Sequence, residues 1–498
     1  MKKRGIIWLL SLCVLCSCDD FLNVSADNEL LQEEIFSSNN GVRMAVNGVY
    51  KELSSTALYA KNLSWGFASA IGQNYQATSS TYLPYDLYMA ANFEWEESSA
   101  MLIAEEIWQH AYNVIASCNN IIQEVTAKDT SFFELGNVEK QMILGEMHGI
   151  RALLHFDLFR LFCPAPVTGE QGHMPYVTTY PDHQPEHVTS DTVMARVIRD
   201  METARRLLAT VDTVFCRSWM TSVSGRLRSA SSWSTGPPNE FVNYRGHRLN
   251  FIAATALLAR IHMYDNDHQK AYEMARLAYS FHTRNWFRWT SSVYQGQITD
   301  VDYIYVKRYD ELFLAFANNK NYNNWEATLG TSSYYFRVKN TAELFRGDED
   351  DFRLVGWYNR YNDQRYITWV RPRGTSYTAQ SVANDQGPLL PVIRFSEMYH
   401  IMIECLIEQG RVPEALTLFR TLRTNRGAKA TIAETIPVEE LKDKLVLDIV
   451  RETLTEGQTF FLFKRLNRDM FNGTESIIMS PRDWVIPIPD SETTYQFN

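Results

Sequence analysis

Cysteine is scarce in this sequence, which has 7 among 498 residues. Three of them lie at the N-terminus, and the others are spread along the chain without a C-x-x-C pair: Cys118, Cys163, Cys216 and Cys405. This spacing excludes a disulfide-stapled scaffold and offers no zinc or dithiol redox motif. The core must therefore form by burial of apolar side chains. The 45% of hydrophobic residues suffice for one large domain or two fused domains.

A hydrophobic run long enough to cross a membrane is also missing. The apolar stretch 6–15 follows Lys2, Lys3 and Arg4 and holds about ten residues, whereas a membrane-spanning helix needs about 20. Asp19 and Asp20 end the run. This pattern predicts a signal peptide.

The end of this segment resembles the lipobox of bacterial lipoproteins, which reads Leu15-Cys16-Ser17-Cys18 here. In such proteins the chain is cut before the cysteine, and the thiol and the new amine are acylated. We therefore expect residues 1–17 to be removed and Cys18 to carry the lipid that anchors the protein to a membrane. The alternative is an ordinary secretory signal with incidental cysteines.

Positive charge is not in excess. The formal net charge is −10, and it becomes −13 when Lys2, Lys3 and Arg4 leave with the signal peptide. An acidic chain argues against nucleic acid or anionic lipid as a general partner and favours neutral or cationic ligands.

Recognisable catalytic signatures are absent too. The sequence has no GxSxG motif, no phosphate-binding glycine-rich loop and no HExxH motif. Glu452 and Glu456 lie one helical turn apart, but basic neighbours favour ion pairs within the chain: Arg451, Lys464 and Arg465. We expect no enzyme activity, no cofactor and no catalytic metal.

Two further clusters allow a functional and a structural interpretation. The run 348–351, Asp-Glu-Asp-Asp, resembles a set of calcium ligands, but a solvated turn after Gly347 is the preferred interpretation. His148 and His155 share a predicted helix without a zinc signature between them. We expect both histidines to be structural.

Helical periodicity dominates the rest of the chain. Apolar residues recur every three or four positions over 39–54, 100–125, 138–162, 188–210 and 438–467. Segments 251–280 and 397–424 each match a helix-turn-helix repeat of the tetratricopeptide kind, with small residues such as Ala271, Ala275 and Ala278 where two helices approach closely. Loop-rich inserts at 57–99, 163–187, 213–247 and 283–395 separate these helices. The predicted fold class is all-α, with tetratricopeptide-like helical pairs and long irregular insertions.

Landmarks along nearly the whole chain are similar to those of the SusD/RagB family of outer-membrane nutrient-binding lipoproteins. They occur in the family's order: Asp-Phe-Leu-Asn-Val at 20–24, Ala-Val-Asn-Gly-Val-Tyr at 45–50, Asn-Asn-Ile-Ile at 119–122, Arg-Ala at 151–152, Phe-Asp-Leu-Phe-Arg-Leu-Phe at 156–162, Glu-Gly-Gln-Thr-Phe-Phe at 456–461 and Ile-Pro-Ile-Pro at 486–489. The chain departs from the family at Cys163, where a glycine is common, and at Asp448-Ile449, where Glu-Arg is usual.

The resemblance implies a binding protein without catalytic activity. It would be displayed on the cell surface by its lipid and would pass oligosaccharides or polysaccharides to a SusC-like TonB-dependent transporter. It divides the chain into an N-terminal SusD-like region, 18–280, and a C-terminal region, 281–498, with the aromatic-rich insert and the closing helices. A peptide-capturing RagB-like protein is the alternative, and an exported glycoside hydrolase is a further one.

Aromatic side chains in polar inserts are the candidate ligand contacts, because sugar rings stack their C–H faces on π systems. Trp95 occupies the place of a stacking tryptophan in starch-binding relatives, as the resemblance implies. The other candidates come from the first and the last insert: Tyr75, Trp286, Trp289, Tyr294, Tyr322 and Trp325. For each ring the alternative is that it packs beneath a loop.

Overall fold

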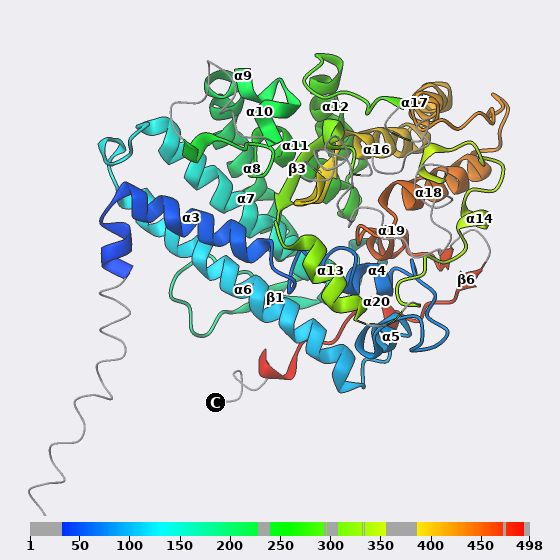
Figure 1. Ribbon diagram of the computed structural model, residues 1–498, viewed down its shortest axis with the longest axis horizontal. Helices are drawn as coiled ribbons and strands as arrows, with labels where there is room; N and C mark the ends of the chain where they lie inside the picture. The colour runs from blue at the N-terminus through cyan, green and yellow to red at the C-terminus, as the bar shows by residue number, and fades with distance from the viewer. Residues whose placement is uncertain are drawn as a thin grey trace, which may run out of the picture.

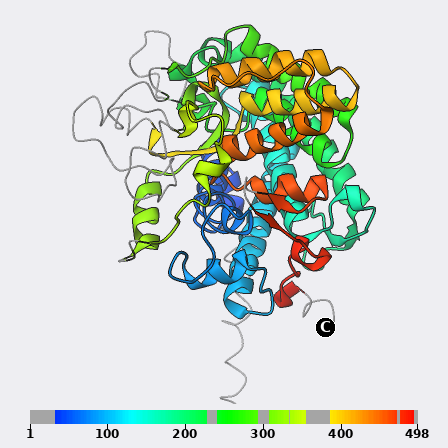
Figure 2. The same cartoon turned by 90° about the vertical axis from the view of Figure 1, so that its right-hand side faces the viewer.

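The chain folds into layers of α-helices with short pairs of strands between them. The computed structural model describes residues 32–227, 240–292, 295, 307–330, 332, 334–354, 386–471 and 475–492. Within these residues the sheets are three antiparallel pairs of strands, and the remaining regular structure is helical. Figures 1 and 2 show the helices packed side by side in successive layers. The predicted all-α fold with helical pairs is confirmed.

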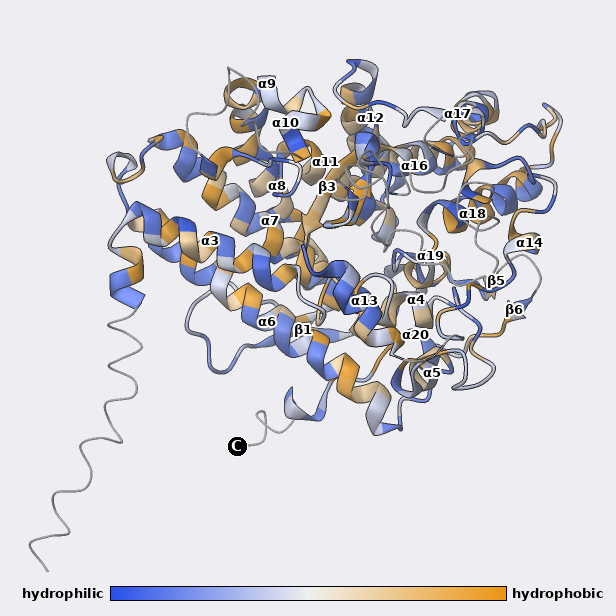
Figure 3. Cartoon of the chain, in the orientation of Figure 1, coloured by the Kyte–Doolittle hydropathy of each residue, from blue (hydrophilic) through white to orange (hydrophobic). Residues whose placement is uncertain are grey.

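Four long helices form the N-terminal half: α3 (Asn39–Leu53), α6 (Ser98–Ala127), α7 (Asn137–Phe162) and α8 (Ser190–Thr210). Each agrees with its predicted range within a few residues. The helix α7 packs against α6 and α8, and its second half is buried around the whole circumference. The helix α3 lies at the edge, and Figure 3 shows hydrophilic residues along its visible side.

Two glycines on α7 allow this close packing. A Cβ on Gly145 would lie 2.7 Å from Cγ of Leu208 on α8, and a Cβ on Gly149 would overlap the side chain of Leu249. Both positions therefore require the absence of a side chain, which explains why glycine is tolerated in the middle of a helix.

Two helical pairs match the predicted tetratricopeptide-like repeats: α11 (Phe251–Tyr264) with α12 (His268–Thr283), and α16 (Phe395–Glu408) with α17 (Val412–Asn425). Ala271, Ala275 and Ala278 of α12 are fully buried. The side chain of Asn250 accepts hydrogen bonds from the N–H groups of Ile252 and Ala253 and so begins α11. The helices α12 and α16 also pack together, which joins the two pairs.

The prediction of one helix over 438–467 is wrong, because the segment forms α18 (Val438–Thr453) and α19 (Thr459–Leu466). Thr455 and Gly457 between them adopt left-handed φ values of 62° and 72°. Their N–H groups donate to Oδ1 of Asn74 and Oγ of Ser69, each over 3.0 Å. Side chains from the first insert thus replace the helical hydrogen bonds that the break removes.

The predicted inserts are less irregular than expected. They and the C-terminal segment contain short helices: α4 (Phe67–Ile71), α5 (Tyr85–Ala91), α9 (Arg217–Met220), α10 (Val223–Leu227), α13 (Asn321–Leu329), α14 (Thr341–Leu344) and α20 (Pro481–Trp484). Short 3₁₀ or π turns occur at Thr130–Phe132, Pro166–Thr168, Val211–Phe215, Glu240–Val242 and Tyr309–Glu311.

The strands also come from these segments. They pair as β1 (His173–Pro175) with β2 (His187–Thr189), β3 (Leu312–Ala317) with β4 (Leu389–Arg394), and β5 (Met470–Phe471) with β6 (Ser476–Ile477). The β3–β4 pair was not predicted, because its partners are far apart in the sequence. It leads directly into α16 and so fixes the last insert against the second helical pair.

Buried ion pairs connect the C-terminal helices to the last insert. Glu452 accepts hydrogen bonds from Arg426 at 2.6 Å and from Arg353 at 3.0 Å, and Arg394 pairs with Glu456. The predicted ion pairing of Glu452 and Glu456 is confirmed, but the expected partners are wrong. Arg451 binds Asp348, Arg465 binds Glu404, and Lys464 donates to the carbonyl oxygen of Arg160.

The acidic run 348–351 is not a solvated turn throughout, which corrects that expectation. Asp348 is buried and pairs with Arg423 and Arg451 at 2.6 and 2.7 Å. Asp351 is buried against Arg353 at 2.7 Å. The carboxylates of Asp348 and Asp351 are therefore paired with arginines. Among the described residues, no group of three or more His, Cys, Asp or Glu could hold a metal ion.

His155 has the structural role that was predicted. Its Nδ1 lies 2.9 Å from the carbonyl oxygen of Arg151, and its Nε2 accepts the N–H of Val177 at 3.1 Å. Burial lowers the pKa of His155 to about 3, so the ring is neutral with the proton on Nδ1. Neighbouring Arg151 pairs with Asp200 at 2.7 Å and donates to Asn119, which explains why these landmark residues occur together.

Candidate functional site

The predicted ligand-contact residues do not form one exposed site. Tyr75 and Trp325 lie in an internal cluster with Trp65 and Phe336, in which Trp65 and Trp325 meet edge to face at 5.1 Å. Tyr75 is 1% exposed and Trp325 is 7% exposed. In this conformation their faces pack against other rings, and their role as ligand contacts stays a prediction.

Trp95 lies beside this region, just before α6. Its ring packs against Phe67 and Phe93 at centroid distances of 6.3 and 6.1 Å, and it is buried. Its Nε1 is buried without a hydrogen-bond partner among the described residues. An indole N–H is costly to leave buried and unsatisfied, so this atom could donate a hydrogen bond to a ligand or a water.

Trp286 and Trp289 belong to a second cluster, around the C-terminal end of α12 and the start of α16. Trp286 packs on Phe281 at 5.0 Å, and Trp289 packs on Phe395 at 4.6 Å. The guanidinium of Arg426 lies 4.9 Å from the Trp289 ring. Tyr294 is outside the described residues. These contacts show that Trp286 and Trp289 pack against other rings of the core. That either ring contacts a ligand stays a prediction.

Tyr322, like Trp289, is only partly buried among the predicted residues. It lies on α13, half-buried, and its hydroxyl donates to Glu326 at 2.7 Å. The helix α13 crosses the front of the molecule in Figure 1, and Figure 3 shows it as largely hydrophilic. The buried ring of Trp325 therefore attaches this largely polar helix to the internal cluster.

An exposed tyrosine, a half-buried tyrosine and one arginine gather close to this cluster. The guanidinium of Arg337 lies 5.0 Å from the ring centroid of Tyr334 and 6.0 Å from that of Tyr82. Tyr334 is 48% exposed and Tyr82 is half-buried. No ion pair of Arg337 with a carboxylate occurs within the described part of the chain, and its Nε is buried without a partner there. We call Tyr82, Tyr334 and Arg337 the tyrosine–arginine platform.

Backbone pairing holds the platform in place. The N–H of Phe336 donates to the carbonyl oxygen of Tyr82 at 2.8 Å, and the N–H of Gln76 donates to that of Arg337 at 2.9 Å. Phe336 itself has a left-handed φ of 60°, and its ring is fully buried in the internal cluster. The buried cluster therefore fixes the segment that carries Tyr334 and Arg337.

The platform offers two kinds of contact at one place. Tyrosine rings provide flat apolar faces, and an unpaired guanidinium provides several N–H donors. Sequence analysis did not select these residues, although Tyr82 and the run Tyr334-Tyr335-Phe336 fall within the aromatic inserts. The pairing of 334–339 with 74–82, which brings the rings to one arginine, carries no sequence signature.

Comparison with known proteins shows which proteins the chain resembles. A family model described as "Starch-binding associating with outer membrane" matches residues 20–220. SusD-like protein P38 of Formosa agariphila is 22% identical over 92% of this chain and 90% of its own length. SusD-like protein P25 of the same organism is 25% identical over 42% of this chain and 39% of its own length.

Solved structures agree on the fold. A SusD superfamily protein from Bacteroides thetaiotaomicron superposes with a TM-score of 0.65 at 18% identity, covering 92% of this chain and 98% of that chain. A protein described as a putative sugar-binding protein from Bacteroides vulgatus gives 0.65 at 18% identity, covering 92% and 96%. The chain therefore has the helical fold of the SusD superfamily structures. It is similar to proteins of the SusD/RagB family along most of its length.

The described helices add one fact about membranes. None of them combines the length and the apolar character that crossing a bilayer requires.

Proposed function

We propose that this protein captures oligosaccharides or polysaccharides at the cell surface and passes them to a SusC-like TonB-dependent transporter. The observation that carries the proposal is the tyrosine–arginine platform, in which the exposed ring of Tyr334 and the half-buried ring of Tyr82 flank an arginine without a carboxylate partner among the described residues. Pyranose rings stack their C–H faces on such rings, and their hydroxyl groups accept hydrogen bonds from guanidinium. Tyr322 on nearby α13 adds a further accessible ring.

Similarity to the SusD/RagB family supports this role, since the family model that matches residues 20–220 is described as starch-binding and associated with the outer membrane. We further propose that a lipid on Cys18 anchors the chain to the outer membrane, as the lipobox predicts. The regions 18–280 and 281–498 remain the proposed division of the chain. The platform contains residues of both regions, because Tyr82 lies in the first region and Tyr334 and Arg337 lie in the second.

Carboxylate geometry supports capture rather than cleavage. Glycoside hydrolysis uses two carboxyl groups that face the scissile bond. Glu452 is buried and Glu456 is only partly exposed, and both form ion pairs with arginines. Neither carboxylate is therefore free to act on a polymer in this arrangement.

Retention on polysaccharide gels tests the proposal. The purified protein would be run through gels that contain starch, xylan, galactomannan or mixed-linkage β-glucan, and we expect at least one polymer to retard it. Arg337→Met keeps the length of the stem and removes the donors, so it should restore normal mobility in that gel. Absence of retardation by every polymer, with binding of peptides instead, would contradict glycan capture.

The transfer step needs a separate test. The protein would be co-expressed with a SusC-like TonB-dependent transporter from the same genome, and we expect the two to co-purify from detergent-solubilised outer membranes. The Cys18→Ala variant should lose palmitate labelling. If label persists in that variant, the lipidation site is elsewhere.

A further inference from the structure

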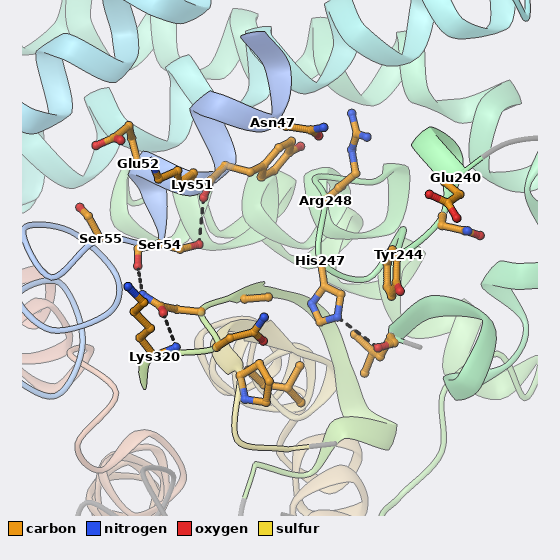
Figure 4. Close-up of a pocket in the computed structure, with 18 of the residues that line it drawn as sticks. Asn47, Lys51, Glu52, Ser54, Ser55, Glu240, Tyr244, His247, Arg248 and Lys320 are labelled. Carbon is orange, nitrogen blue, oxygen red and sulfur yellow. Dashed lines mark hydrogen bonds between the residues drawn. The ribbon is translucent and has the colours of Figure 1, made fainter. Parts of the chain in front are cut away.

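A concave surface lies apart from the tyrosine–arginine platform. It is a cleft of about 1120 Å³ between α3, the segment 240–248 and the loop that follows β3 (Figure 4). No platform residue lines it. Sites that take one drug-sized ligand have volumes of about 300–1,000 Å³, so this cleft has room for a chain of several sugar units.

The charged side chains at the floor of the cleft are already paired with one another. Buried Glu146 accepts hydrogen bonds from Arg248 at 2.7 Å, from the hydroxyl of Tyr50 at 2.9 Å and from Arg245. Arg43 is paired with Glu139 and Glu134 in the same way. The arginines in and under the cleft are therefore occupied, and they present no unpaired positive charge to a ligand.

Amide side chains line the walls above this floor: Asn47, Asn243, Asn318 and Asn319. Asn318 is fixed by donating to the carbonyl oxygen of Ser54 at 2.6 Å and accepting the N–H of Lys320 at 2.7 Å. Asn47, Asn243 and Asn319 have no side-chain hydrogen bond within the described residues. Free amides can both donate to and accept from the hydroxyl groups of a sugar.

Three Tyr and Phe rings line the cleft, Tyr50, Phe241 and Tyr244, and Tyr244 is the most exposed of them. Tyr244 is 37% exposed and has a φ of 58°, in the left-handed region that bulky residues rarely adopt. The turn is held because the N–H of His247 donates to the carbonyl oxygen of Tyr244 at 2.7 Å, and because adjacent Arg245 is buried against Asp212. Figure 4 shows Tyr244 at one end of the cleft, next to Glu240 and opposite Lys51. Strained backbone that exposes a ring in a cleft is typical of a ligand contact.

Charges that remain free in the cleft balance each other. Lys51 and Lys320 are exposed, as are Glu52 and Glu240, and none of the four forms an ion pair with another described residue. The balance removes the net positive field that a sulfated or uronate-rich polymer would require. A neutral, hydroxyl-rich ligand fits the lining better.

We infer that this cleft is a second saccharide-binding site, which holds a neutral segment of several sugar units with Tyr244 as the stacking ring. The inference rests on the proposed capture of glycans, but it assigns a separate site. A long polymer that occupies the cleft and the platform together would be held more tightly than by either alone.

Calorimetric titration with the neutral polysaccharides starch, xylan, galactomannan and mixed-linkage β-glucan tests the inference. Tyr244→Gly removes the ring and relieves the strained φ, so it should fold at least as well as the wild type while weakening binding at least fivefold. Tyr244→Phe keeps the ring and should bind like the wild type. Tyr272→Ala, on α12 outside both surfaces, is the matched control. The unfolding midpoint of each variant would be measured alongside.

The outcomes separate the two sites. If Tyr334→Ala weakens binding and Tyr244→Gly does not, the cleft site is refuted and the platform stands. If only Tyr244→Gly weakens binding, the cleft is the site and the platform proposal fails. Wild-type protein that binds none of the four polymers, or only anionic ones such as pectate, would overturn the assignment of a neutral ligand.

Discussion

Thr455 donates its backbone N–H to Oδ1 of Asn74 over 3.0 Å, although the two residues are 381 positions apart in the sequence. Asn74 also donates to Oγ1 of Thr459 at 3.0 Å. One buried side chain of the first insert therefore closes the break between α18 and α19. The C-terminal helices are fixed in place by the segment that also carries Tyr75 and Tyr82.

Removing Asn74 should destabilise the whole fold. In Asn74→Ala, the N–H of Thr455 is left buried without an acceptor, and the free energy of unfolding should fall by about 1–3 kcal/mol. Urea denaturation followed by circular dichroism measures the change. Asn425→Ala, which removes an exposed amide on α17, is the control and should change stability by less than about 0.5 kcal/mol. Equal effects of both variants would contradict the bridging role of Asn74.

The Asp348 ion pairs should make stability depend on pH. Burial raises the pKa of Asp348, but hydrogen bonds from Arg423 and Arg451 outweigh this effect and hold the pKa below its ordinary value. A lowered carboxyl pKa contributes stability that is present above the unfolded pKa, about 3.9, and is lost as pH falls through the folded pKa. Denaturant titrations at pH 7, 4 and 3 should show this loss in the wild type.

The Asp348→Asn variant should lose about 3–5 kcal/mol at pH 7, because Arg423 and Arg451 remain buried without their anion. It should show less further loss between pH 4 and 3 than the wild type. Asp350→Asn is a matched control in the same run, since Asp350 forms an exposed pair with Lys429 and should contribute about 0–1 kcal/mol. A parallel pH dependence of wild type and Asp348→Asn would refute this account.

Two glycine-to-alanine variants should have opposite effects. Gly149→Ala on α7 would drive a methyl group into Leu249 and lower stability by about 1–3 kcal/mol through overpacking. Gly48→Ala on α3 meets no atom within 4 Å and should raise stability by about 0.5–1 kcal/mol, because alanine favours the helix. Thermal unfolding measures both, and a stabilised Gly149→Ala would show that α7 and the segment at Leu249 are further apart.

Sequence patterns predicted the helices and the repeats well, since Ala271, Ala275 and Ala278 must lie where two helices touch. They could not predict the split at Thr455 and Gly457. Local periodicity continues through that break, and the compensating hydrogen bonds come from residues 69 and 74. The β3–β4 pair was not predicted for the same reason. Its two strands are far apart in the sequence, and local patterns do not show that they pair.

The candidate site was predicted in composition but not in detail. The platform residues do lie in two of the aromatic inserts, 57–99 and 283–395. A sequence, however, does not distinguish a ring that is buried, such as Trp325, from one that is exposed, such as Tyr334. Exposure depends on which segments pair, and here the pairing of 334–339 with 74–82 decides it. Arg337 was missed because an arginine in an aromatic run has no distinctive signature.

A Trp95 variant distinguishes a contribution of the buried rings to stability from a contribution to glycan binding. Its faces pack on Phe67 and Phe93, so Trp95→Phe should lower the unfolding midpoint while leaving glycan affinity within about twofold of the wild type. A change in affinity of tenfold or more at unchanged stability would instead make Trp95 a ligand contact, as the family resemblance implies. Calorimetry and thermal unfolding on the same sample separate the two results.

The central claim is that the exposed tyrosine–arginine platform captures glycans. The most direct measurement is a calorimetric titration of the retained polysaccharide into Tyr82→Ala/Tyr334→Ala, next to the wild type and Tyr272→Ala. The account predicts at least a tenfold loss of affinity in the double variant, about 1.4 kcal/mol, with an unchanged unfolding midpoint and normal binding by Tyr272→Ala. Wild-type affinity in a folded double variant would contradict it.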